Sequence, residues 1–209
     1  MRTSCVAQSI LAAAICIAIP TLCEAESSFR TGAGALTATA HVDFQITIPK
    51  FLFLRVGSGV GTASGGYATQ ATIDEITWAP IAAQVGAGPM AGTGGDLTGG
   101  VESAVVVANH GNVRLSSTTT GPLSDGNGDT ISFATITTTA SHNTTATTLL
   151  APALANGATR TVTLTAVNKV VRQDAKWAYT YANATRPPAG TYGGINVRGG
   201  RVTYTASVP

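Results

Sequence analysis

One long stretch of the chain, residues 36–48, alternates strictly between apolar and polar side chains. A period of two is typical of a β-strand that has one face buried and the other in solvent. Pro49 follows directly and ends the predicted strand, because proline has no N–H to donate to a ladder. The apolar face of this alternating segment consists of Leu36, Ala38, Ala40, Val42, Phe44, Ile46 and Ile48.

The rest of the chain has the pattern of strands separated by turns. Residues 51–56 are apolar except for Arg55 and end at Gly57, as expected of a strand covered on both faces. Threonine, which favours strands, is the commonest residue after position 25, and clear helical periodicity is absent. The sequence predicts an all-β sandwich or barrel, with the Gly-rich stretches 57–66 and 86–100 as loops. The other strand candidates are residues 71–78, 101–108, 113–119, 130–137, 159–167, 176–182 and 201–208.

Residues 1–25 have the features of a secretory signal peptide. Arg2 supplies the positive start, residues 10–19 are apolar, and Pro20 precedes a cleavage site that ends at Ala25. The apolar run is too short to span a bilayer, so we expect an exported, soluble chain with no transmembrane anchor. Lipid attachment at Cys23 is the alternative interpretation.

Composition excludes several kinds of chemistry. All three cysteines, Cys5, Cys16 and Cys23, lie within the predicted signal peptide, so disulfides, thiol catalysis and cysteine-ligated metals are excluded from the mature chain. The 12 Lys and Arg residues are scattered among 10 Asp and Glu residues, and the net charge is +2. Nucleic-acid binding usually needs a cluster of basic residues, so we expect no nucleic-acid partner.

No motif of a catalytic or metal site stands out. Residues 125–129 resemble the start of a calcium loop, but Ile136 occupies the position of the bidentate glutamate, and a tight turn is the better interpretation. Asp74 and Glu75 are adjacent, so in a strand their carboxylates point to opposite faces. We expect no catalysis and no cofactor. The histidines, which lack ligand-like spacing, are His41, His110 and His142.

Three aromatic residues, Trp177, Tyr179 and Tyr181, fall on one face of a predicted strand. Such a face is a sugar-binding platform if it is exposed, and it supplies a large part of the core if it is buried. Burial is the commoner arrangement, and we expect it here.

The last third of the chain carries three runs, WAYTYAN at 177–183, PAGTYGG at 188–194 and GRVTYTASVP at 200–209. Together they resemble the closing strands of bacterial fimbrial subunits, the pilins of the chaperone–usher kind. The resemblance implies an immunoglobulin-like antiparallel β-sandwich that lacks its final strand. In that family the N-terminal extension of the next subunit is donated into the gap, by strand addition to an open edge. It further implies related subunits and a periplasmic chaperone as partners, with transit through the periplasm to the cell surface or a fimbrium.

By this resemblance residues 26–50 hold the donor strand, and the donor face is the apolar face of residues 36–48. Residues 51–209 form the sandwich domain. The acceptor edge is then Val202, Tyr204, Ala206 and Val208. An intramolecular strand that completes its own sandwich would give the same pattern. The function expected is that of a secreted structural surface subunit. The alternative is a self-contained secreted β-sandwich module that binds carbohydrate or a surface, through aromatics such as Trp78 or Trp177.

We predict that the mature protein begins at Glu26, because the apolar run and the small residues before position 26 form one cleavage signal. Mass analysis of the N-terminal peptide, after expression in an exporting host, measures this directly. A chain that begins at a lipidated Cys23 would contradict the prediction.

Overall fold

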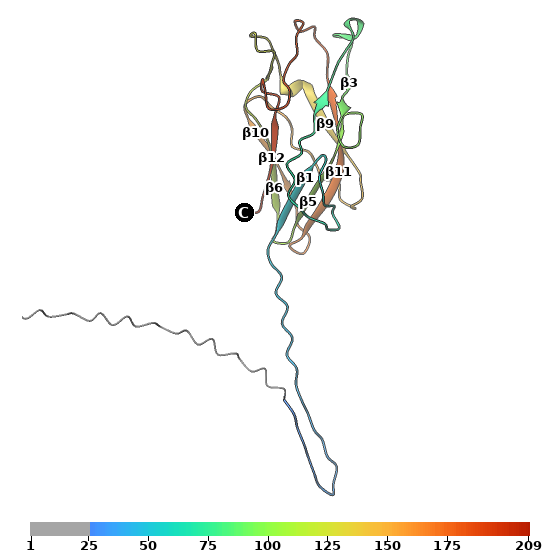
Figure 1. Cartoon of the computed structure of the whole chain (residues 1–209), viewed down its shortest axis with the longest axis vertical. Helices are drawn as coiled ribbons and strands as arrows, with labels where there is room; N and C mark the ends of the chain where they lie inside the picture. The colour runs from blue at the N-terminus through green and yellow to red at the C-terminus, as the bar shows by residue number, and fades with distance from the viewer. Residues whose placement is uncertain (1–25) are drawn as a thin grey trace, which may run out of the picture. The chain divides into compact units, whose positions relative to one another are not determined.

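The computed structural model describes residues 26–209, and the predicted signal peptide lies outside the described residues. The chain divides into two units, with the boundary between Ile48 and Pro49. Residues 49–209 form an all-β sandwich of antiparallel sheets, as the sequence predicts (Figure 1). No helix in the described part of the chain is long and apolar enough to cross a membrane.

The larger sheet is built around two long strands in its middle. β5 (Val101–Ala108) pairs on one side with β1 (Leu52–Val56) and on the other with β11 (Val171–Tyr181). β9 (Ile136–Ser141) and the short β3 (Met90–Ala91) pair with the second half of β11. All of these ladders are antiparallel, and β1 is the end strand on its side of the sheet.

The smaller sheet has three strands in the order β10, β6, β12. β6 (Val113–Thr119) lies between β10 (Thr159–Leu164) and β12 (Val202–Ser207), and both ladders are antiparallel. Short elements complete the fold: β2 (Ile76–Thr77) with β4 (Thr93–Gly94), β7 (Leu123–Ser124) with β8 (Thr130–Ile131), and the 3-10 turns η1 (Ala82–Gln84) and η2 (Phe133–Thr135).

The main core lies between the two sheets. Trp177 of β11 is fully buried there, with its indole Nε1 donating a 2.8 Å hydrogen bond to the Leu149 carbonyl. Tyr179 and Tyr181 are buried on the same face of β11, so the expected aromatic contribution to the core is confirmed. The buried residues that surround them include Ala104, Val106, Val113, Leu115, Leu164 and Val171.

A second, smaller core covers the outer face of β1. Phe53 packs there with Val105, Val107 and Ala63, which belongs to the Gly-rich loop 57–66. Arg172 fixes this loop, since its Nε and Nη2 donate to the Ala63 carbonyl and the Ser64 hydroxyl, both at 2.8 Å. β1 is therefore covered on its outer face, whereas its inward residues Leu54 and Val56 are only half-buried, so the predicted cover on both faces is found in part.

Several strand boundaries differ from the sequence prediction. The bounds of β5 and β6 are confirmed, whereas the strand predicted over 71–78 shrinks to the two residues of β2. The strand predicted over 130–137 is broken, because the Ser132 side chain accepts from the Ala134 N–H and starts η2. β11 begins at Val171, five residues before the predicted start at 176. β9 was missed, because its run of threonines hides the alternation of buried and exposed positions.

The alternating segment forms no strand in the single chain. Residues 26–48 carry no ladder, and the side chains of Phe44 and Ile46 are 90% and 86% exposed. The prediction of a half-buried strand over 36–48 is therefore wrong for the single chain. The physical reason is that a strand with this pattern needs a neighbour for its backbone and an apolar surface for its face.

We predict that Trp177→Ala lowers the free energy of unfolding by ~3–5 kcal/mol, because it leaves a large cavity and an unpartnered Leu149 carbonyl. Urea denaturation followed by circular dichroism measures the change. Val197→Ala is the matched control, since Val197 is 53% exposed and its truncation should change the stability by less than about 0.5 kcal/mol. Equal effects of the two substitutions would contradict the burial of Trp177.

Candidate functional site

Two edge strands lie next to each other where the two sheets meet (Figure 1). β1 ends the larger sheet and β12 ends the smaller one, and in the described part of the chain no strand pairs with their free edges. They run in opposite directions, because β5 and β6 are joined by the short turn 109–112 and each pairs antiparallel with its neighbour. Each free edge therefore presents backbone N–H and C=O groups without a ladder partner.

The side chains that point inward from these two strands form an apolar strip that is only partly covered. Their outward neighbours on β12, Thr203, Thr205 and Ser207, are exposed, so the predicted alternation along β12 is confirmed. The strip combines the four residues predicted as an acceptor edge with two from β1. We call it the open edge: Leu54, Val56, Val202, Tyr204, Ala206 and Val208, all half-buried and packed against the main core.

Tyr204 ties the open edge to the core. Its ring lies 5.2 Å from that of Trp177, and its hydroxyl is 3.0 Å from the Tyr179 hydroxyl. Burial raises the pKa of Tyr204 to about 12 and also raises the pKa of Tyr179. Both hydroxyls therefore stay neutral at physiological pH and can donate and accept within the pair. β12 is held in register at its middle although one of its edges is free.

The predicted donor face belongs to the other unit of the chain, which ends at Ile48. Its residues from Leu36 to Ile48 are all exposed, including Ala38 and Ala40. In this segment His41 Nδ1 lies 2.7 Å from the Glu26 carboxylate, and both side chains are exposed. The acceptor and donor roles both stay predictions. In both the predicted donor face and the open edge, backbone groups have no ladder partner, and apolar side chains are exposed or only half-buried.

Asn109 fixes the residues that lead into β1. Its side-chain amide donates to the Pro49 carbonyl at 2.8 Å, and its Oδ1 accepts from the Phe51 N–H at 2.9 Å. The Asn109 N–H also donates to the Phe51 carbonyl, which extends the pairing of β1 with β5 by one position. Residues 49–51 are therefore held extended as a continuation of β1. No signal in the sequence marked Asn109, because its role depends on this cross-strand position.

A group of carboxylates lies beyond the end of β1. Glu102 is 4% exposed, and Asp74 and Asp96 are its neighbours. Burial raises the pKa of Glu102 to about 8, and the negative charge of Asp74 adds to the shift. Asp96 accepts from the Ser103 N–H at 2.6 Å, and Asp74 accepts from the Ser58 N–H. Because Asp96 and Asp74 accept from backbone N–H groups, these carboxylates stabilise the chain around the end of β1.

Asp174 is a second buried carboxylate, with a different environment. It is 2% exposed and accepts hydrogen bonds from the backbone and hydroxyl groups of Thr144 and Thr145. Burial by itself would raise the pKa of Asp174, but these hydrogen bonds outweigh it and lower the pKa to about 2. The carboxylate thus stays ionised and anchors the loop that precedes Leu149 to β11, as the bond from the Leu149 N–H to the Asp174 carbonyl also does.

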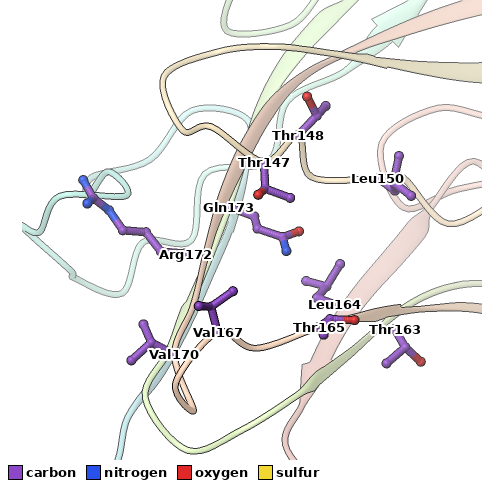
Figure 2. A pocket seen from close by; sticks show the side chains of 10 residues that line it. All are labelled: Thr147, Thr148, Leu150, Thr163, Leu164, Thr165, Val167, Val170, Arg172 and Gln173. Carbon is purple, nitrogen blue, oxygen red and sulfur yellow. The ribbon is translucent and has the colours of Figure 1, made fainter.

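A cavity of about 500 Å³ opens between β10, the chain around Leu150 and the start of β11 (Figure 2). Its lining is mainly threonine and aliphatic, and Arg172 is the one charged residue in it. Figure 2 shows Arg172 extending away from the other lining side chains, toward the loop that holds Ala63 and Ser64. The lining therefore supplies no pair of groups for acid–base catalysis.

The predicted turn at residues 125–129 is confirmed. It joins β7 to β8, and the Asp125 carboxylate accepts from the N–H groups of Asn127 and Asp129 at 2.8 and 3.0 Å. Among residues 26–209, no group of three or more His, Cys, Asp or Glu side chains is placed to hold a metal ion.

The aromatic platform required by the binding-module alternative is not formed by Trp177, which is fully buried. Trp78 is half-buried and packs against the main core, with its ring 6.3 Å from that of Tyr181. The use of Trp177 as an exposed sugar-stacking residue is therefore wrong, because the aromatic face of β11 points between the sheets.

Comparison of the chain with protein-family models, with curated proteins and with solved structures finds no match.

We predict that Glu102 contributes to the free energy of unfolding, and that this contribution falls as pH rises from about 4.5 to about 8. The folded chain holds the Glu102 proton up to about pH 8, whereas the unfolded chain releases it near pH 4.5. Stability from this group is therefore fully present below the unfolded pKa and is lost as pH rises through the folded one. Glu102→Gln should flatten this part of the profile, measured by urea denaturation across the range.

Glu75→Gln is the matched control, because Glu75 is an exposed carboxylate next to Asp74. It should leave the pH profile of the parent chain unchanged. A Glu102→Gln profile as steep as that of the parent would show that Glu102 titrates normally.

Proposed function

We propose that this protein is a structural subunit that assembles by strand donation between copies. Residues 36–48 of one copy pair with the open edge of the next and fill the place between β1 and β12. The observation that carries the proposal is that one chain has both an unpaired apolar–polar alternating segment and a partly covered apolar strip between two free strand edges. Addition of the segment as a strand would give both backbones ladder partners and would bury the apolar side chains of both surfaces.

The two surfaces match in chemistry and in period. A strand inserted between β1 and β12 gains ladder hydrogen bonds, and every second side chain enters the sandwich. The alternating segment presents seven apolar residues at that spacing, and β12 with Val208 presents four. Complete burial of side chains such as Val42, Phe44 and Ile46 stabilises the complex by ~1.5–3 kcal/mol each. The polar residues between them remain in solvent.

The junction between segment and domain favours donation to another copy. Only Pro49, Lys50 and Phe51 separate Ile48 from β1, and Asn109 holds Pro49 and Phe51 extended. A hairpin back onto β1 needs a reverse turn in these residues, and a parallel arrangement beside β1 needs a crossover of about a dozen residues or more. Neither fits the chain as it is held. A second copy's segment has no such constraint.

The same exposed surfaces explain the partners that the fimbrial resemblance implies. An apolar strand segment and an uncovered sheet edge promote nonspecific pairing until they are filled. A chaperone that covers the open edge during export would prevent this, and assembly at the cell surface would then replace it with a neighbouring subunit. The absence of cysteine from residues 26–209 means that ladder and apolar contacts supply the stability of the assembly.

We predict that Phe44→Asp prevents assembly of the mature chain, because it places a charge in the centre of the face that must be buried. Gln45→Asp is the matched control, with the same charge on the adjacent, solvent-facing position, and it should assemble like the parent. Gel filtration and negative-stain electron microscopy of the mature protein measure assembly. Equal behaviour of the two variants would contradict the role of the alternating face.

The acceptor half is tested by the same logic. Ala206→Glu introduces a charge into the open edge, whereas Thr205→Glu places it on the exposed face of β12. Only Ala206→Glu should block assembly, and it should also abolish binding of a synthetic peptide of residues 36–48. A parent chain that stays monomeric at all concentrations and binds no such peptide would refute strand donation and leave the self-contained binding module as the better hypothesis.

A further inference from the structure

Residues 67–74 lead from the Gly-rich loop 57–66 toward β2 and are not part of any sheet. They belong to no helix or strand, and among residues 26–209 they form no backbone–backbone hydrogen bond. Most of their side chains are exposed, and Ile73 is 54% exposed. A segment of this kind is weakly held, because it has neither a ladder nor a buried apolar face.

This segment nevertheless follows β1 along its length. A cavity of about 110 Å³ separates the two, with Ala68, Gln70 and Thr72 on one side. On the other side lie four consecutive residues of β1, from Phe53 to Val56. Side chains of consecutive strand residues point to opposite faces, so a cavity that meets all four lies at the edge of the strand. The other edge of β1 is paired with β5, which leaves the free edge.

Two contacts hold the segment in this position, one at each end. The Tyr67 ring stacks on the Phe51 ring, with centroids 5.5 Å apart, and packs in a tilted arrangement against the Phe53 ring, with centroids 4.7 Å apart. At the far end, the Asp74 carboxylate accepts from the Ser58 N–H. Gly57 makes room there, because a Cβ at this position would collide with the Asp74 and Glu102 carboxylates.

We propose that residues 67–74 are a displaceable strap that covers the free edge of β1 and is released when a donated strand pairs there. The inference rests on the proposed strand donation. The strap occupies the place of a ladder without forming one, so its removal breaks no backbone–backbone hydrogen bond and costs only the Ser58 N–H bond to Asp74. The strap shields the β1 edge from nonspecific pairing. Its release from β1 is then a separate step in assembly, before the donated strand pairs there.

The test uses the full mature chain with Phe44→Asp, so that its own donor is disabled, and a fluorescent peptide of residues 36–48. Adding Tyr67→Ala should speed peptide association by roughly two- to tenfold, the factor that corresponds to one lost aromatic contact. Asp74→Asn weakens the other anchor and should act in the same direction. Thr69→Ala is the matched control, since Thr69 is exposed and should leave the rate unchanged.

Nuclear Overhauser contacts between the Tyr67 and Phe53 rings report the strap itself. They should be present in the free chain and lost in the peptide complex. Peptide binding with these contacts retained, or with rates unaffected by both anchor variants, would overturn the strap and leave strand donation standing. No peptide binding by any variant, with folding verified by circular dichroism, would overturn both proposals.

Discussion

The unpaired backbone at the end of each sheet is the constraint on which the rest of the structure depends. Every N–H and C=O group that leaves water must find a partner, and a sheet that ends without one must be covered or filled. Here β1 and β12 end their sheets side by side, and the inward side chains of both are only half-buried. The core between the sheets is closed, whereas the inward side chains at this side are only partly covered.

The stable part of the fold explains how such an edge can persist. The main core is closed around Trp177, and the Tyr179–Tyr204 hydroxyl pair fixes β12 to it from within. On the larger sheet, Phe53 and the Gly-rich loop cover β1 from outside. Each edge strand is therefore held by one ladder and by side-chain packing. The free edges do not have to support the fold, and neither is paired in a ladder.

The sequence predicted features that depend on local pattern, and it missed those that depend on tertiary contacts. The strands β5 and β6 were found at their observed bounds, because their apolar residues and flanking turn residues mark them. The inward face of β12 was found from its alternation. For residues 36–48 the pattern shows which face would be buried, but a pattern cannot say which chain supplies the neighbour. Asn109 and residues 67–70 have no periodic signal at all, and the strand pattern over 71–78 indicated a ladder that only Ile76 and Thr77 form, since these positions are set by partners far away in sequence.

The Asn109 contact has a mechanical consequence. In a filament built by strand donation, a pull along the axis enters each domain through residues 49–51, which Asn109 keeps extended as a continuation of β1. The force then acts along β1, and its five residues slide against β5 together. In this shear geometry all the hydrogen bonds of the ladder share the load, whereas a bent junction would peel them apart one after another. In such a filament, a single asparagine side chain would decide whether tension loads the first ladder as a whole or breaks it bond by bond.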